Sequence, residues 1–317
     1  MLAALHIPEK TVTLPVLTVS ALKVLLYYDL FRYPLTASEI LYHCRHQGCT
    51  ESQLHNSLSA LISDGKIFHY DGYYLLKNDP HLIERRIKGN ALAEKMKQKA
   101  VKKSELIARF PYVRGICISG SLSKNYCDET TDIDFFIITA PGRLWVCRSL
   151  LILYKKLFLL NSKKYFCINY FIDSENLSIP DKNIFTATEI ITLIPSYNHA
   201  LYSDFFRANN WIADYYPNAT MVQCNTSLSK ESLIKRTLEK LLDTQLGEWL
   251  DRYFYKTTIN HWKKKFKGMD EAAFELNMRS RKDVSKHHPQ GFQFRVLKMY
   301  DENCRAFEAK HGIPLLS

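Results

Sequence analysis

The sequence predicts an α+β protein, in which a small mixed sheet accompanies regions that are mainly helical. Apolar residues recur at helical spacing between residues 18 and 63, and three short apolar runs between residues 115 and 172 have the length of strands. Residues 185–317 again show a helical pattern, broken at Pro195 and Pro217. We therefore expect three domains, at residues 1–80, 81–184 and 185–317.

The first region is predicted to contain three helices. Thr36 and Thr50 are the expected N-caps of the second and third, and Gln53 completes a capping box with Thr50. Pro34 separates the first helix from the second. The expected helices lie at residues 18–31, 37–44 and 50–63.

A hairpin follows, because Asp71 and Gly72 form a preferred two-residue turn between residues 67–70 and 73–76. Three helices and such a hairpin resemble a winged helix-turn-helix domain, whose third helix usually enters the DNA major groove. Residues 50–63 contain no Lys or Arg to neutralise phosphates. DNA binding is therefore an open alternative, and we favour a packing or partner-docking module.

Charge narrows the class of partner. The chain has 43 Lys and Arg against 32 Asp and Glu, a net charge of +11, which suggests nucleic acid, a nucleotide or an acidic surface. Apolar residues make up 46%, which excludes a largely disordered chain. Residues 81–109 are expected to form a helix rich in cations, as either a solvated face or a basic rim that steers a polyanion. Its cations are Arg85, Arg86, Lys88, Lys95, Lys97, Lys99, Lys102 and Lys103.

Two features predict a cytoplasmic location with no membrane association. The N-terminal residues lack the basic start and long apolar core of a signal peptide. The eight cysteines have no CxxC spacing, and we expect reduced thiols, several of them buried in strands or helices.

The residues that carry chemistry lie between two predicted strands, at residues 115–119 and 133–139. A flexible Gly120-Ser121 turn follows the first strand and can present N–H groups and a hydroxyl to a phosphate. Asp132 and Asp134 come after ten intervening residues and alternate along the second strand, so both are expected on one face. Two adjacent carboxylates favour Mg²⁺, which binds carboxylates together with substrate phosphates. This arrangement suits in-line attack on a nucleotide α-phosphate.

Residues 115–139, GICISGSLSKNYCDETTDIDFFIIT, resemble the signature of the DNA polymerase beta-like nucleotidyltransferase superfamily. The resemblance extends over about residues 100–175 and fits a predicted helix at 144–160 and a third strand at 165–172. It implies that Gly120 and Ser121 hold a nucleoside triphosphate, that Asp132 and Asp134 bind Mg²⁺, and that Lys124 touches a phosphate. The chain also resembles uncharacterised bacterial nucleotidyltransferase-domain proteins with an N-terminal winged helix.

The superfamily normally adds a third carboxylate on the third strand. Asn169 occupies the middle of that strand, and Asp173 follows near its end on the same face by period-two alternation. Asp173 is therefore a candidate catalytic acid, and Asn169 a candidate nucleotide contact. An amide at the usual position of the carboxylate cannot accept a proton as a base.

The resemblance implies transfer of a nucleoside monophosphate from an NTP to an unidentified acceptor hydroxyl, with release of pyrophosphate. The acceptor is a small molecule, a protein or an RNA end. The alternative is a non-catalytic protein that senses nucleotide, or binds DNA or a partner, through a degenerate transferase site. A toxin or antitoxin that modifies its partner is a third alternative. Further candidates for phosphate contacts are Arg143, Arg148 and the basic segment at residues 286–289.

Overall fold

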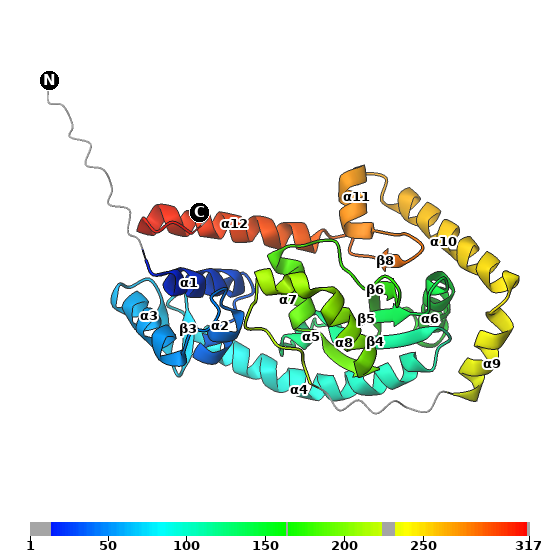
Figure 1. The fold of residues 1–317 in the computed structure, drawn as a ribbon, viewed down its shortest axis with the longest axis horizontal. Coiled ribbons are helices and arrows are strands. Elements are labelled where there is room, and N and C mark those ends of the chain that lie inside the picture. Colours follow the sequence, from blue (N-terminus) through cyan, green and yellow to red (C-terminus); the bar gives the residue numbers. More distant parts are fainter. Residues whose placement is uncertain (1–13, 163, 224–231, 316–317) are drawn as a thin grey trace, which may run out of the picture. The chain divides into compact units, whose positions relative to one another are not determined.

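The computed structural model describes residues 14–162, 164–223 and 232–315, and it confirms the expected α+β class (Figure 1). The chain divides into two compact units. The first comprises Met1–Arg86, Ala213–Ala219 and Phe294–Ser317, and the second Ile87–Ile212 and Thr220–Gln293.

In the first unit, local capping determines where the helices begin. Thr36 and Thr50 each accept a hydrogen bond from the backbone three residues on, and Glu39 and Gln53 return the bond, so both capping boxes are present. Asp71 and Gly72 have φ values of 49° and 80°, as the predicted two-residue turn requires. The helices are α1 (Val16–Asp29), α2 (Ala37–His43) and α3 (Glu51–Ser63).

The hairpin in this unit gains a third strand that the sequence did not predict. Strands β2 (Phe68–Tyr70) and β3 (Tyr73–Leu75) pair antiparallel, and the two-residue β1 (Leu35–Thr36) pairs with the other edge of β3. The sheet order is therefore β1-β3-β2.

Arg86, which the sequence placed in a cation-rich exposed helix, is instead buried at 4% exposure. Its guanidinium donates to both carboxylate oxygens of Glu39, at 2.7 and 2.6 Å, and lies over the rings of Tyr33 and Tyr73. The expectation of a solvated or steering role is therefore wrong for this residue, because a bidentate partner and two aromatic rings compensate its desolvation.

The second unit contains a five-stranded mixed sheet of order β7-β4-β5-β6-β8, in which only β5 and β6 run parallel. The three central strands agree with the sequence prediction to within two residues. The strands are β4 (Val113–Ser119), β5 (Asp134–Thr139), β6 (Cys167–Asp173), β7 (Ile194–Tyr197) and β8 (Val284–Lys286).

The chain after residue 185 was predicted to be helical, and β7 and β8 correct this expectation. Both strands form the edges of the sheet, so segments far apart in sequence complete one structure. Pro195 lies inside β7, where an edge position tolerates a residue without an N–H group. The three residues of β8 are too few to show a strand period.

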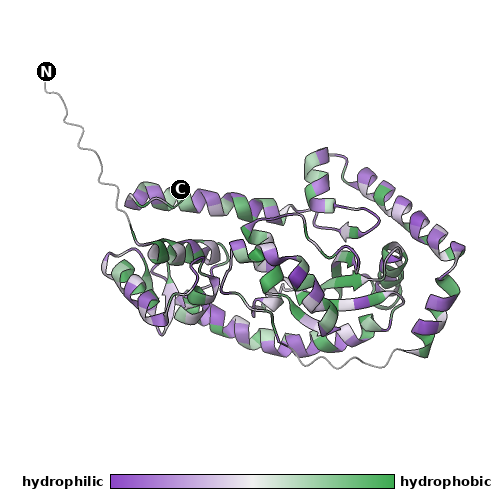
Figure 2. Cartoon of the chain, viewed as in Figure 1, coloured by the Kyte–Doolittle hydropathy of each residue, from purple (hydrophilic) through white to green (hydrophobic). Residues whose placement is uncertain are grey.

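Helices cover both faces of this sheet. Buried residues of α4 (His81–Ala108), α6 (Leu144–Phe158) and α10 (Gln245–Lys265) share one apolar cluster with β4, β5 and β6. On the other face, Phe205 of α8 (His199–Ala208) packs against Phe136, with ring centroids 5.1 Å apart. The central strands are accordingly hydrophobic in Figure 2. The remaining elements are α5 (Gly120–Ser123), α7 (Ile184–Ile191), η1 (Asn210–Asp214), α9 (Leu233–Leu242), α11 (Glu271–Met278) and α12 (Phe292–His311).

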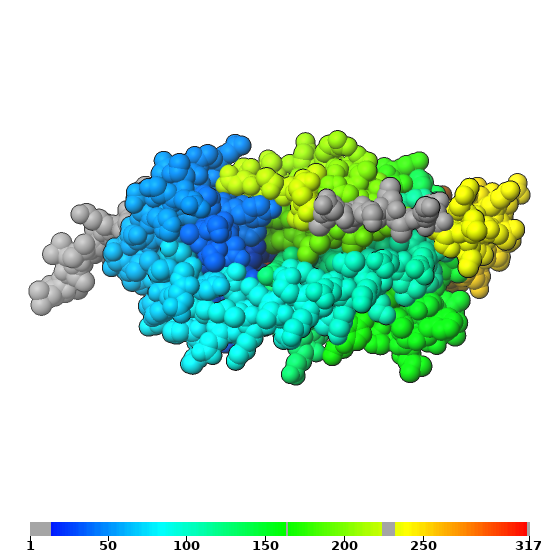
Figure 3. Space-filling model, turned by 90° about the horizontal axis from the view of Figure 1, so that it is seen from below, coloured from blue at the N-terminus to red at the C-terminus, as the bar shows by residue number. Residues whose placement is uncertain are grey.

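Beyond Arg86, most of the predicted basic helix is solvated. Lys88, Lys95, Lys99 and Lys102 are exposed, while Ala93 and Ala100 face the core. The side chains of α4 project from the surface in Figure 3.

Seven of the eight cysteines are described, all as free thiols, and six of them are buried. Cys224 and the N-terminal residues used for the signal-peptide expectation lie outside the described residues. Within the described part of the chain, none of the helices combines the length and apolarity needed to cross a membrane.

Candidate active site

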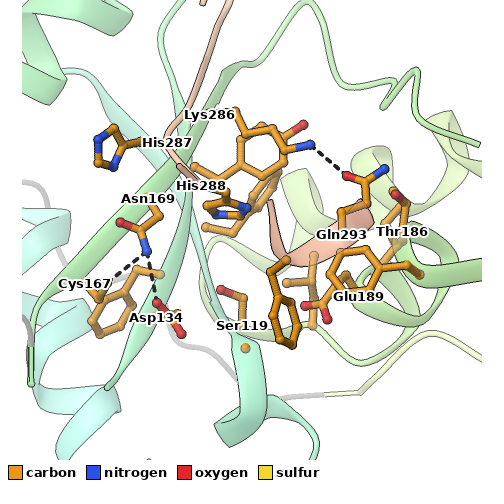
Figure 4. A pocket seen from close by; sticks show the side chains of 18 of the residues that line it. Ser119, Asp134, Cys167, Asn169, Thr186, Glu189, Lys286, His287, His288 and Gln293 are labelled. Carbon is orange, nitrogen blue, oxygen red and sulfur yellow. Dashed lines mark hydrogen bonds between the residues drawn. The ribbon is translucent and has the colours of Figure 1, made fainter. Parts of the chain in front are cut away.

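A pocket of about 470 Å³ lies where β4 ends and β5 begins. Five of the residues predicted from the sequence line it together: Gly120, Ser121, Asp132, Asp134 and Asn169. Figure 4 shows Asn169 and Ser119 on either side of Asp134, and Glu189 farther from it in the same pocket. The pairing of Ser119 with Asp134 in adjacent strands explains why the turn and the acidic pair meet.

Gly120 is required at the turn for two reasons. Its φ is +69°, a conformation that L side chains rarely adopt. A Cβ at this position would also overlap the Asp134 carboxylate. The Gly-Ser turn and the carboxylate are therefore held closer than any other residue at position 120 would allow.

Burial dominates the electrostatics of Asp134. Removal from water raises the pKa of this carboxyl to about 6, and the negative charges of Asp132 and Glu189 act in the same direction. Hydrogen bonding from Cys167 and the positive charge of Lys124 oppose the rise. A buried carboxylate beside two others creates a strongly negative point in the pocket.

Lys124 approaches the site without lining the pocket. Its Nζ donates to the Gly120 carbonyl at 3.1 Å and lies 2.7 Å from Glu189 Oε1. The sequence did not identify Glu189, a pocket residue on α7, because a lone Glu within an apolar helical run carries no motif.

A β-bulge directs Asn169 toward Asp134. Along the parallel pair of β5 and β6, Phe135 pairs with Ile168 and Phe136 with Tyr170, which leaves Asn169 as an extra residue. Its Nδ2 lies 3.3 Å from Asp134 Oδ1 and 2.9 Å from Cys167 Sγ. The predicted period-two relation between Asn169 and Asp173 does not hold, because the bulge interrupts the alternation.

Asp173 lies at the opposite end of the strand from the pocket. In the register of β5 and β6, Asp134 pairs with Cys167 and Thr139 pairs with Asp173. The five steps of strand from Asp134 to Thr139 correspond to about 17 Å. Asp173 Oδ1 accepts hydrogen bonds from the backbone of Glu175 and Asn176. This geometry fits a turn-stabilising residue, and the structure does not bring Asp173 to the acidic pair.

The segment at residues 286–289, suggested by the sequence as a phosphate-facing loop, lines the pocket, and its first residue is the last of strand β8. Lys286 is 4% exposed, and its Nζ donates to Asp181 Oδ2 at 3.1 Å and to Gln293 Oε1 at 2.9 Å. The Arg279 guanidinium donates to both carboxylate oxygens of the same Asp181, at 2.7 Å to Oδ1 and 3.1 Å to Oδ2. Burial lowers the pKa of His288 to about 4, so its ring is neutral near pH 7.

Arg143 and Arg148, the other candidate phosphate ligands, do not line the pocket. The Arg148 guanidinium lies over the ring of Trp262, 4.8 Å from its centroid, and burial lowers its pKa to about 10. Arg143 forms an ion pair with Asp243, in which Nε lies 3.8 Å from Oδ1. Arg143 is the N-cap residue of α6 and Arg148 lies within this helix. Because α6 packs on the face of the sheet opposite to the pocket, the expectation of a phosphate contact is wrong for both residues.

Among the residues that the structure describes, no group of three or more His, Cys, Asp and Glu side chains is arranged to hold a metal ion. The available donor set consists of the carboxylates of Asp132 and Asp134 with the Asn169 amide beside them. Comparison of the chain with protein-family models, curated proteins and solved structures gave no match.

Proposed function

We propose that this protein is a Mg²⁺-dependent nucleotidyltransferase, which moves a nucleoside monophosphate from an NTP to an acceptor hydroxyl and releases pyrophosphate. One observation carries the proposal: the Asp134 carboxylate lies directly against Gly120, and Asp132 and Ser121 line the same pocket. The α+β unit around the pocket is consistent with a nucleotidyltransferase fold.

The residues present fit a magnesium ion. Asp134 is buried and its pKa is raised, so a cation would relieve an unfavourable charge. Mg²⁺ is typically held by one or two carboxylates and completes its shell with substrate phosphates and water, which suits Asp132 and Asp134. When bound, the ion supplies positive charge against the triphosphate and the charge that develops during transfer.

The chain's own groups would position the reactants. Backbone N–H groups of the turn and the Ser121 hydroxyl donate to the triphosphate, while Lys124 adds a nearby positive charge. The acceptor oxygen forms a bond to the α-phosphorus as the bond from that phosphorus to the bridging oxygen breaks. Pyrophosphate leaves with the electron pair of the broken bond.

The acceptor hydroxyl must also lose its proton. The Asn169 amide cannot take it, and Asp181 is held by Arg279 and Lys286. We assign this task to Glu189, the remaining pocket carboxylate outside the acidic pair. Its Oε1 is paired with Lys124, which keeps the side chain at the pocket.

A second candidate function is nucleotide sensing without transfer. Asn169 favours it, because the amide stands beside Asp134 where the superfamily has its third carboxylate. A protein of this kind binds NTP and Mg²⁺ but transfers nothing.

The first unit contains three helices followed by a hairpin, the elements on which the winged-helix resemblance rests. The outer face of α3 presents Glu51, Ser52, His55, Asn56 and Ser59, all exposed and none cationic. Phosphate neutralisation would need cations here, so we propose partner docking for this unit in preference to DNA binding.

Label transfer tests the proposed function. The purified protein is incubated with Mg²⁺, each α-labelled NTP in turn and a lysate of its host, and label is followed into protein, RNA and small molecules. Label that depends on Asp132 and Asp134, shown with the D132N/D134N double variant, supports transfer. Nucleotide binding without any label in any fraction supports the sensing function.

A further inference from the structure

The pocket extends from the acidic pair to a second polar surface, made by Lys286 and Gln293, which we call the donor wall. Both side chains line the pocket, and they are 4% and 5% exposed. Much of the remaining lining is apolar or aromatic, from Tyr170, Phe185, Ile190, Phe205 and Phe292. A volume of about 470 Å³ is sufficient for a small ligand with a flat ring.

The chemistry of Lys286 fixes the orientation of the Gln293 amide. A lysine ammonium has only N–H donors, so the atom of Gln293 that meets it at 2.9 Å is the carbonyl oxygen. A flipped amide would set two donors against each other. Figure 4 shows this hydrogen bond, and the NH₂ group at the other side of the amide is the donor that Gln293 keeps for a ligand.

Asp181 fixes the position of the Lys286 ammonium. Lys286 Nζ donates to Asp181 Oδ2 at 3.1 Å, and Arg279 fixes Asp181 through a bidentate pair. Two N–H bonds of the ammonium are directed at Asp181 and Gln293, which leaves the third as a further donor. The acceptors beside it are already engaged, since Asp181 accepts from Lys286 and Arg279 and the Gln293 carbonyl oxygen accepts from Lys286, so the donor wall offers N–H groups to a ligand.

From this geometry we infer that the pocket binds the nucleobase between its aromatic side chains and selects bases with a keto oxygen, guanine or uracil. The inference rests on the proposed nucleotide site, because the Gly120-Ser121 turn holds the triphosphate and the base then occupies the rest of the same cavity. Guanine O6 and uracil O4 are acceptors, whereas adenine and cytosine carry an amino donor at the equivalent position. That amino group would meet the fixed N–H donors of the donor wall.

Calorimetric titration of the full chain in the presence of Mg²⁺ tests this selectivity. The probes are the non-hydrolysable α,β-methylene analogues of GTP, UTP, ATP and CTP. We expect the GTP or UTP analogue to bind at least about tenfold more tightly than the ATP and CTP analogues. Equal affinities, or tighter binding of an amino base, would overturn the inference.

Gln293→Glu provides a reversal test. One carboxylate oxygen would still accept from Lys286, and the other would turn an acceptor toward the ligand, so the preference is expected to shift to ATP and CTP. The matched control is Gln98→Glu, the same change at an exposed position on α4. An unaltered keto preference in folded Gln293→Glu contradicts the inference. If circular dichroism shows that Gln293→Glu is unfolded, Gln293→Leu is measured in its place. Loss of the amide NH₂ should then reduce the preference for the GTP or UTP analogue. An undiminished preference in Gln293→Leu would also contradict the inference.

The two proposals fail differently. Binding of all four analogues without discrimination removes the base selectivity and leaves the nucleotidyltransferase proposal in place. If none of the four analogues binds, both the base selectivity and the nucleotidyltransferase proposal fail.

Discussion

The backbone of Gly120 approaches the Asp134 carboxylate so closely that a single Cβ on residue 120 would overlap Asp134 Oδ2. The Gly120-Ser121 turn and the Asp134 carboxylate are therefore held together by the absence of a side chain on residue 120. Any ligand that contacts both must be small at this point and must tolerate a buried negative charge.

Gly120→Ala is expected to cost more stability than Gly142→Ala. Both glycines have positive φ, at 69° and 64°, so both variants share the backbone strain. Only residue 120 meets a neighbour, since a Cβ on Gly142 would have nothing within 4 Å. Urea unfolding should show an additional loss of at least about 1 kcal/mol for Gly120→Ala. Equal losses in the two variants would contradict the close approach.

Asp134→Asn is expected to stabilise the metal-free protein near neutral pH. The pKa of Asp134 is raised to about 6 from 3.8, so the folded state binds the proton more tightly than the unfolded chain. The stability that Asp134 contributes is complete at pH values below its unfolded pKa of 3.8, and it is lost as the pH rises through the folded pKa of about 6. Two pKa units correspond to about 3 kcal/mol.

Thermal melts with chelator at about pH 7.5 and about pH 4.5 test this sign. The variant should melt above the wild type at the higher pH, and the gap should shrink at the lower pH, where Asp134 is protonated. A wild type that is the more stable of the two at the higher pH would refute the buried-charge argument.

Glu189→Gln is expected to lower nucleotidyl transfer by about 100-fold or more, the usual contribution of a general base. NTP affinity should change little, because the amide keeps the shape of the side chain. Glu175→Gln, an exposed change near the far end of β6, is the control. Loss of NTP affinity in step with the transfer rate would assign Glu189 to binding instead.

Arg86→Met is expected to destabilise the first unit by about 3–5 kcal/mol, because it leaves Glu39 without its bidentate partner in a partly buried site. Lys77→Met removes the ion pair between Lys77 and Asp29, in which the lysine side chain is 67% exposed, and should cost less than about 1 kcal/mol. Chemical denaturation compares the two variants. Similar losses would mean that the Arg86 pair adds no more than a surface pair.

Local signals in the sequence were sufficient for the first unit and the centre of the sheet. Thr36 and Thr50 define helix starts through hydrogen bonds only three residues away, and Asp71-Gly72 defines a turn through its own backbone. The Gly120-Ser121 turn and the acidic pair were found because their two strands are neighbours both in sequence and in the sheet.

Other parts of the site depend on tertiary pairing that no local pattern reports. Gln293 and Lys286 reach the pocket because β8 pairs with β6, more than a hundred residues earlier in the chain. A bulge at Asn169 changes the face of one side chain, so strict alternation placed Asp173 wrongly. Arg86 was expected on a solvated or steering helix face and Arg148 at a phosphate, and both instead lie over aromatic rings from distant segments.

Comparison of Asp134→Asn with Asp173→Asn in the label-transfer assay tests the central claim most directly. Both variants change one carboxylate to its amide on adjacent strands, but only Asp134 lies at the Gly120-Ser121 turn. We predict that transfer is abolished in Asp134→Asn and persists in Asp173→Asn, with both proteins folded by circular dichroism. Persistence of transfer in Asp134→Asn, or its loss only in Asp173→Asn, would contradict the assignment of the acidic pair as the centre of the reaction.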